Sequence, residues 1–334
     1  MFTTACRLLF FFVFLFLLSP SYGFCGAKKR YNVLVVMSYH ESYQWENEIR
    51  DGIASVLSRL SELKYVYLDS KKNYPGAAAK ASNFFELYKE IRPDGVIAVD
   101  DAAQSLFVVP YLKDKVATPV MFCGVNKQAE DYGYPAANVS GVLERIHMRE
   151  TLAFLKQLVP SVKTFCAVLK ADDTSRGILK QFQREAETYP VRFTASVTPR
   201  DYNEALEAVS SLKTKCDSLF LTPLDGLRGE DGEPLSSREI VPFLIKSFGG
   251  PAFAGISNDL QAGILCSVLK TGQEQGSTAA RMLLQAMSGT PVSGLPVTVN
   301  RNGKRVINVT ALRKLGISVR PVVLRGAELV TTVE

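Results

Sequence analysis

The sequence predicts an α/β protein with two doubly wound lobes, each a parallel sheet covered by helices on both faces. Short apolar runs alternate with longer amphipathic segments over residues 32–330. This alternation is typical of parallel strands joined by right-handed helical crossovers. The chain contains ten such runs, more than one sheet of ordinary size holds, and the series divides near residues 141–149. Two sheets are therefore expected.

The expected strands are short runs rich in Val, Ile, Leu and Phe. They are residues 32–37, 65–68, 95–99, 120–122 and 139–142 in the first half, and 164–169, 192–196, 218–221, 252–254 and 263–268 in the second. Cysteines 123, 166 and 266 lie inside these runs and Cys216 lies just before one. We expect these four to be small buried residues that form no disulfides.

Helices are predicted where apolar residues recur at steps of three and four. Residues 45–60 show the pattern clearly, with Trp45, Ile49, Ile53, Val56 and Leu60 on one face. The other expected helices are residues 77–91, 151–158, 175–187, 202–213, 236–247 and 273–288.

The N-terminus has the organisation of a secretory signal peptide. Arg7 precedes the apolar run of residues 8–18, and small residues follow it. We expect residues 1–23 to be removed, with cleavage after Ala27 as the alternative, and the mature protein to be periplasmic or otherwise extracytoplasmic. The alternative interpretations of this segment are an uncleaved membrane anchor and lipid modification of Cys25.

Composition and motifs argue against several functions. The net charge of +6 comes without a basic block, so no nucleic-acid partner is expected. With two histidines and no CxxC pair, no metal site is expected. The GxSxG, GxxxxGK[ST] and GxGxxG motifs are missing, so we expect neither an enzyme nor a bound cofactor.

Polar and aromatic side chains follow the predicted strands. Since ligands meet the carboxyl ends of parallel strands, these residues are the candidate binding site. The candidates are Ser38, Tyr39, His40, Trp45, Asp101 and Asn126 in the first half, and Asp172, Thr174, Asp225, Asn258 and Asp259 in the second. Such side chains suit a small polar or zwitterionic molecule with an apolar portion.

Each candidate also has a structural interpretation. Asp, Ser, Thr and Asn commonly cap helices, and we expect Asp173 and Thr174 to do so. His40 is the best candidate for acid–base chemistry, although a hydrogen-bonding role is the more general use of such a residue. Trp45 either packs its helix on the sheet or borders the ligand.

Four stretches resemble a known family. These are VLVVMSYHESYQWENEIRDGI, TPVMFCGVN with NVSGVLE, LVPSVKTFCAVLKADDTSR, and GILCSVLKTGQEQGSTAARMLLQAMSGTPVSGLPV with VINVTALRKLGISV. Together they resemble the substrate-binding proteins of ABC transporters that have a type I periplasmic-binding-protein fold. The resemblance implies a venus flytrap whose lobes are joined by a three-strand hinge, with crossings near residues 142–145, 268–272 and 295–298. Lobe 1 would comprise residues 32–143 and 270–295, and lobe 2 residues 144–269 and 296–330.

The resemblance implies a monomer that captures a small solute, most readily an amino acid or similar zwitterion, and delivers it to an ABC permease. Tyr39 and Trp45 would border the apolar portion, a second-lobe aspartate would meet an ammonium, and Asn126 or Thr174 would orient a carboxylate. A purine or a short peptide would also fit the same set of candidate side chains. The alternatives are a ligand-sensing protein that signals to a membrane kinase or cyclase, and a secreted α/β enzyme using His40.

Overall fold

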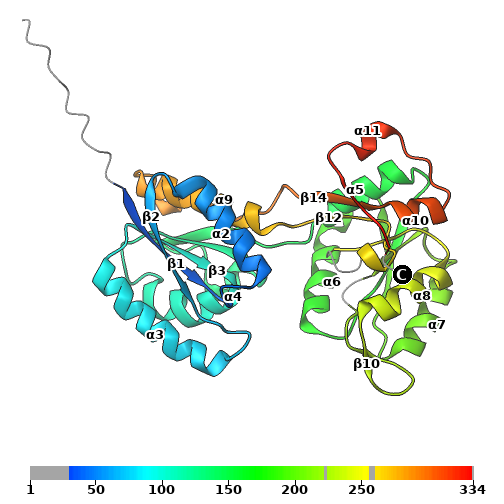
Figure 1. The fold of residues 1–334 in the computed structure, drawn as a ribbon, viewed down its shortest axis with the longest axis horizontal. Helices are drawn as coiled ribbons and strands as arrows, with labels where there is room; N and C mark the ends of the chain where they lie inside the picture. Colours follow the sequence, from blue (N-terminus) through cyan, green and yellow to red (C-terminus); the bar gives the residue numbers. More distant parts are fainter. Residues whose placement is uncertain (1–29, 222–223, 256–259, 333–334) are drawn as a thin grey trace, which may run out of the picture. The chain divides into compact units, whose positions relative to one another are not determined.

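The computed structural model describes residues 30–221, 224–255 and 260–332, and only the backbone of Asp173 and Thr174. The predicted signal peptide lies outside these residues. A first sheet of six parallel strands has the order β13-β5-β4-β3-β1-β2. Its strands are β1 (Tyr31–Met37), β2 (Ser61–Tyr67), β3 (Gly95–Val99), β4 (Val120–Val125), β5 (Val139–Leu143) and β13 (Thr298–Val299). Figure 1 labels its strands β1, β2 and β3.

Helices cover both faces of this sheet because successive strand residues point to opposite sides. Val33, Val35 and Met37 pack with α2 (Gln44–Leu57) and α9 (Gly272–Met287) on one face. Leu34 and Val36 pack on the other face with α3 (Tyr74–Ile91) and the helical segment of α4 (Asp100–Ala103) and η1 (Gln104–Leu112). A strand buried on both sides explains why residues 33–37 are continuously apolar.

Glycine allows α2 and α9 to approach closely. A Cβ atom added to Gly276 would lie 2.1 Å from the carbonyl oxygen of Ile49, a distance that real Cβ atoms do not adopt. Helix α9 thus returns to the first sheet, far along the chain, and packs beside α2.

A second sheet has seven strands in the order β15-β14-β12-β11-β8-β6-β7. They are β6 (Thr164–Val168), β7 (Arg192–Val197), β8 (Ser218–Leu221), β11 (Ala252–Phe253), β12 (Cys266–Leu269), β14 (Lys304–Asn308) and β15 (Glu328–Val330). All neighbours are parallel except β12 and β14.

Two hydrophobic clusters cover the faces of the second sheet. Helices α5 (Met148–Leu158), α6 (Asp173–Glu185) and α10 (Val309–Lys314) contribute to one cluster, with Leu152, Phe182 and Leu312. Helices α7 (Tyr202–Leu212) and α8 (Ser237–Phe248) contribute to the other. The short elements are the hairpin of β9 (Leu227–Arg228) and β10 (Pro234–Leu235), α11 (Pro321–Leu324), η2 (Ala129–Tyr132), η3 (Ala186–Thr188), η4 (Leu260–Ala262) and η5 (Val292–Gly294).

The α/β class with two sheets was predicted correctly, but two features differ from expectation. The chain remains in the first sheet as far as Val299, because β13 pairs with β5, whereas the expected boundary was at residue 295. The helical segment from Asp100 to Leu112 was not predicted. It contains Pro110, a residue that ordinarily disfavours a helix interior. Its apolar residues do not recur on one helix face, because the segment is packed into the hydrophobic cluster beside the sheet.

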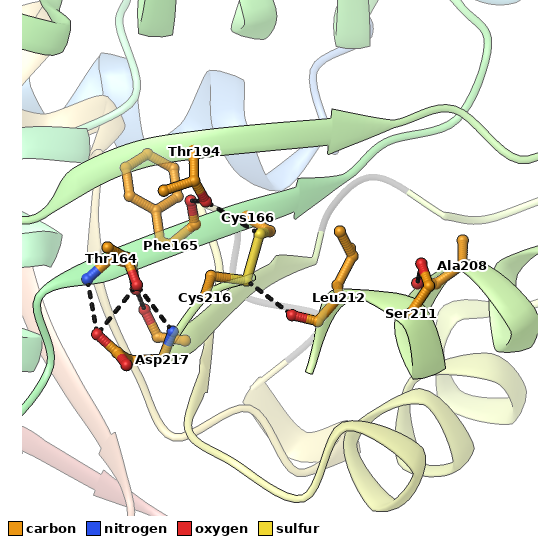
Figure 2. The surroundings of a disulfide bond; sticks show 10 residues. Thr164, Phe165, Cys166, Thr194, Ala208, Ser211, Leu212, Cys216 and Asp217 are labelled. Carbon is orange, nitrogen blue, oxygen red and sulfur yellow. Dashed lines mark hydrogen bonds between the residues drawn. A yellow bond between two sulfur atoms is a disulfide. The ribbon is translucent and has the colours of Figure 1, made fainter. Parts of the chain in front are cut away.

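The expectation that the cysteines are unpaired is wrong for two of them. Cys166 and Cys216 form a disulfide with a Cα–Cα distance of 5.9 Å (Figure 2). The carboxylate of Asp217 accepts hydrogen bonds from the backbone and hydroxyl of Thr164, which fixes the residue after Cys216 beside the start of β6. Cys123 and Cys266 are buried and free, as expected.

Candidate functional site

Ser38 joins the carboxyl ends of two strands in the first sheet. Its buried hydroxyl donates to the carbonyl of Val99 and accepts from the backbone N–H of Ala103 at 2.8 Å. Its carbonyl accepts two hydrogen bonds from Ser70, one from the backbone and one from the hydroxyl. Ser38 therefore positions the loops after β1, β2 and β3, and its hydroxyl already has a donor and an acceptor partner.

Trp45 and Asp100 lie at this same sheet edge. The half-buried indole, in the first turn of α2, donates from Nε1 to Oδ1 of Asp100 at 3.2 Å. Asp100 directly follows β3 with φ of +62°, and only 2% of its surface is exposed. Its second oxygen, Oδ2, has no hydrogen-bond partner among the described residues.

Glu46 provides a second buried carboxylate. Oε1 accepts from the backbone N–H of Tyr39 at 2.6 Å, whereas Oε2 has no partner in the described part of the chain. Burial raises the pKa of Glu46 to about 7. Burial, followed by the charges of Glu46 and Glu144, also raises the pKa of Asp100 well above its usual range. The two carboxyl groups thus favour a proton, or a ligand's cation, beside them.

An aromatic group borders these acids. The rings of Tyr39 and Tyr43 meet edge to face at 5.2 Å, and the ring of His40 lies 5.6 Å from that of Tyr43. Burial, and then the charge of Asp100, raises the pKa of the Tyr39 phenol. His40 contacts the hydroxyl of Ser42 through Nδ1 at 3.0 Å. No ion pair links His40 to a carboxylate of the described chain, so the geometry provides no acid–base pair there.

Asp101, a predicted ligand contact, organises the loop after β4. Its carboxylate accepts from the backbone of Asn126 at 3.0 Å, from the backbone of Lys127 at 3.3 Å and from the hydroxyl of Tyr132 at 2.7 Å. Asn126 is exposed, and its side-chain amide donates to the carbonyl of Gly124. Of Asp100 and Asp101, only Asp100 has a buried oxygen without a partner among the described residues, although Asp101 was the predicted contact.

Gly124 makes room for the Asp100 carboxylate. Its φ is +72°, and an added Cβ would lie 2.4 Å from Oδ1 of Asp100. Its backbone N–H donates to the side-chain oxygen of Gln275 in α9 at 2.9 Å. The pairing register of β4 and β5 shifts between Phe122 and Val125, as a bulge requires. The lack of a Cβ atom at position 124 therefore leaves the space that the Asp100 carboxylate occupies.

Polar contacts connect this edge with the segments that lead to the second sheet. Lys270 pairs with the buried Glu144, and its ammonium lies 6.0 Å from the centre of the Trp45 ring. Asn300 accepts from the backbone N–H of Arg145 at 2.7 Å and donates to the carbonyl of the same residue. Three chain segments, after β5, after β12 and after β13, thus meet beside the site.

Two of the predicted residues of the second sheet form hydrogen bonds at the starts of helices. Asp172, rather than Asp173 or Thr174, is the N-cap of α6, and its Oδ1 accepts from the backbone of Ser175 at 2.8 Å. Both carboxylate oxygens of Asp225 accept from Ser237 at the start of α8. The Thr174 side chain, Asn258 and Asp259 lie outside what the structure describes.

The described part of the chain supports neither a metal site nor a membrane-spanning helix. There, no three His, Cys, Asp or Glu residues are grouped so that they could hold a metal ion. Likewise, none of its helices combines the length and apolar character needed to cross a bilayer. What the arrangement offers is a pair of buried carboxylates beside aromatic rings.

Comparison with known proteins identifies similar molecules. The family model described as "ABC transporter substrate binding protein" matches residues 31–331. A ligand-free, open substrate-binding protein with adhesive properties from Clostridium difficile is 16% identical, with a TM-score of 0.69, covering 91% of this chain and 100% of its own. A domain from Streptococcus pneumonia in complex with L-Trp is 20% identical, with a TM-score of 0.55, covering 90% and 100%. No curated protein matches in sequence.

Proposed function

Because the chain belongs to the family of ABC transporter substrate-binding proteins, we propose that it captures an amino acid or a similar zwitterion outside the cytoplasm and delivers it to an ABC permease. Membership of the family makes it a binding protein for a small solute. The class of solute and the delivery step are the proposal.

The observation that supports this proposal is the pair Trp45 and Asp100. The indole holds one oxygen of a buried carboxylate and leaves the other oxygen free. A ligand ammonium can donate to that free oxygen in a charge-assisted hydrogen bond, and Glu46 offers a second free oxygen nearby. The rings of Trp45 and Tyr39 can border the apolar part of the same molecule. The complex of the Streptococcus pneumonia domain with L-Trp is consistent with such a ligand.

The ligand would also contact the second lobe. We assign this role to the residues after β6, β8 and β11, which are Asp172, Thr174, Asp225, Asn258 and Asp259. The segments after β5, β12 and β13 would act as the hinge. Closure requires that the solute bind the closed form more tightly, which happens only if it contacts both lobes there.

A thermal-shift screen of the mature protein against the twenty standard amino acids, sugars, purines and dipeptides tests the solute class. We expect a hit among the amino acids, because a ligand at a hundred times its Kd stabilises a protein by about 2.7 kcal/mol. Stabilisation by a sugar or a purine alone would contradict the proposal.

Two further measurements test the rest of the proposal. Trp45 is the only tryptophan of the chain, so addition of the hit should change its fluorescence. The ligand should be recovered chemically unchanged, whereas turnover would indicate the enzyme alternative. ATP-driven uptake by vesicles that contain the permease would support delivery, and activation of a membrane kinase or cyclase without uptake would indicate sensing instead.

A further inference from the structure

Lys71 is held between two aromatic rings at the edge of the candidate site. Its ammonium lies 4.1 Å from the centre of the Tyr39 ring and 3.9 Å from that of Tyr43. It also donates to the phenol oxygen of Tyr43 at 2.6 Å. Lys71 belongs to the segment between β2 and α3, which is anchored at Ser70 by two hydrogen bonds to Ser38. The position of this cation is therefore fixed at both its backbone and its head group.

The charge of Lys71 is not neutralised by an ion pair. None of the ion pairs formed within the described residues includes it. Two aromatic faces stabilise a cation without removing its charge. A lysine ammonium has three N–H donors, and the phenol of Tyr43 accepts from one of them. Donors thus remain for an anion.

Lys71 also lies near the buried acids. Its positive charge lowers the pKa of Glu46 against the larger effect of burial. Tyr39 connects the two groups directly, because its ring contacts Lys71 and its backbone N–H donates to Glu46. The ring of Tyr39 therefore contacts a fixed cation, while its backbone N–H holds a carboxylate that has one free oxygen.

We infer that Lys71 receives the carboxylate of the bound solute while Asp100 and Glu46 receive its ammonium. This inference rests on the proposed function, since it assigns the anionic half of the zwitterion to a residue. It replaces the earlier expectation that Asn126 or Thr174 orients the carboxylate. The rings of Tyr39 and Tyr43 act as positioning groups that hold the ammonium of Lys71 in place.

The test compares charged and uncharged forms of one ligand. Calorimetry would measure the affinity of wild type and Lys71→Met for the amino acid with the largest thermal shift and for its carboxamide, which lacks the negative charge. Lys72→Met is the matched control, because Lys72 is the next residue, equally charged and exposed. We expect Lys71→Met to weaken binding of the amino acid at least tenfold and that of the carboxamide less than twofold, with Lys72→Met unchanged.

Other outcomes overturn the inference. If Lys71→Met weakens both ligands equally, or neither, Lys71 only stabilises its loop. Lys71→Arg keeps the charge and should retain most of the affinity, so a loss equal to that of Lys71→Met would also count against it. Melting curves of each variant exclude unfolding. If wild type binds no amino acid, the proposed function itself fails, whereas normal binding by Lys71→Met defeats only this inference.

Discussion

The indole N–H of Trp45 donates a hydrogen bond to Oδ1 of Asp100, 3.2 Å away and 55 residues later in the chain. This contact joins the start of α2 to the end of β3. It satisfies one oxygen of a carboxylate that is almost fully buried, and it leaves Oδ2 without a partner among the described residues. A buried group with an unmade hydrogen bond costs about 1–3 kcal/mol, which a ligand donor can recover.

Asp100→Asn is expected to weaken binding of the amino acid by about tenfold to a hundredfold, because a hydrogen bond to a charged group contributes about 1.5–3 kcal/mol. The asparagine can still accept from Trp45, so the fold should be retained. Titration calorimetry measures the loss. Asp94→Asn is the control, since Asp94 caps the opposite end of the sheet through Asn32. Equal affinity of Asp100→Asn and wild type would show that Asp100 does not bind the ligand.

The raised pKa of Glu46 predicts a stability that falls with pH. In the unfolded chain the carboxyl ionises near pH 4.5, whereas in the folded protein it keeps its proton until about pH 7. Protonated Glu46 therefore adds to the unfolding free energy in full below pH 4.5, and this stabilisation is lost as the pH rises from 4.5 to 7.

Glu46→Gln should remove this dependence. Glutamine keeps an oxygen for the backbone N–H of Tyr39 but carries no charge. Relative to wild type, we expect the variant to gain about 3 kcal/mol in unfolding free energy between pH 4.5 and 7.5. Urea denaturation at a series of pH values measures it, with the exposed Glu62→Gln as control. A difference that does not change with pH would contradict the assignment.

Much of the fold could be predicted because apolar periodicity and burial have the same cause. The strand of residues 95–99 was predicted to the residue, since it is buried on both faces and bounded by polar residues. The segment from Asp100 to Leu112 was not, because tertiary packing rather than amphipathic period makes it helical. Strand β14 was also missed. Its first two residues, Lys304 and Arg305, are exposed and charged and its last is Asn308, so its apolar run is only two residues long.

The candidate site could be predicted only as far as the sheet edge that carries it. Strand order places residues 38–45, 100–101 and 124–126 together, and the structure brings them into contact. Which of Asp100 and Asp101 has a free oxygen depends on side-chain hydrogen bonds between distant residues, which no local pattern records. Lys71 was missed for the same reason, because a lysine in a polar loop is ordinarily solvated.

Gly124→Ala is expected to disturb the site as well as the backbone. Alanine costs about 1 kcal/mol at a positive φ, and here its Cβ would also lie 2.4 Å from Oδ1 of Asp100. Gly249→Ala is the matched control, because Gly249 has a φ of +75° with nothing within 4 Å of an added Cβ. We expect Gly124→Ala to be less stable than the control by about 1–2 kcal/mol and to change the Trp45 emission spectrum, which the control should leave alone. If Gly124→Ala and Gly249→Ala were equally destabilised and the Trp45 emission were unchanged, the Asp100 carboxylate would shift away from the new Cβ without loss of stability, which contradicts this prediction.

The disulfide between Cys166 and Cys216 closes a loop of 50 residues that includes α6, β7 and α7. Loop-closure entropy for such a length predicts a contribution of up to about 4 kcal/mol, and measured values are typically about 2–4 kcal/mol. The double substitution Cys166→Ala/Cys216→Ala should therefore lower the unfolding free energy by about that amount. Cys123→Ala, which changes a free buried cysteine, is the control and should cost less. Titration of thiols in the denatured protein before and after reduction should show two additional thiols on reduction, as one disulfide requires. If reduction released none, Cys166 and Cys216 would be thiols and the original expectation of unpaired cysteines would stand.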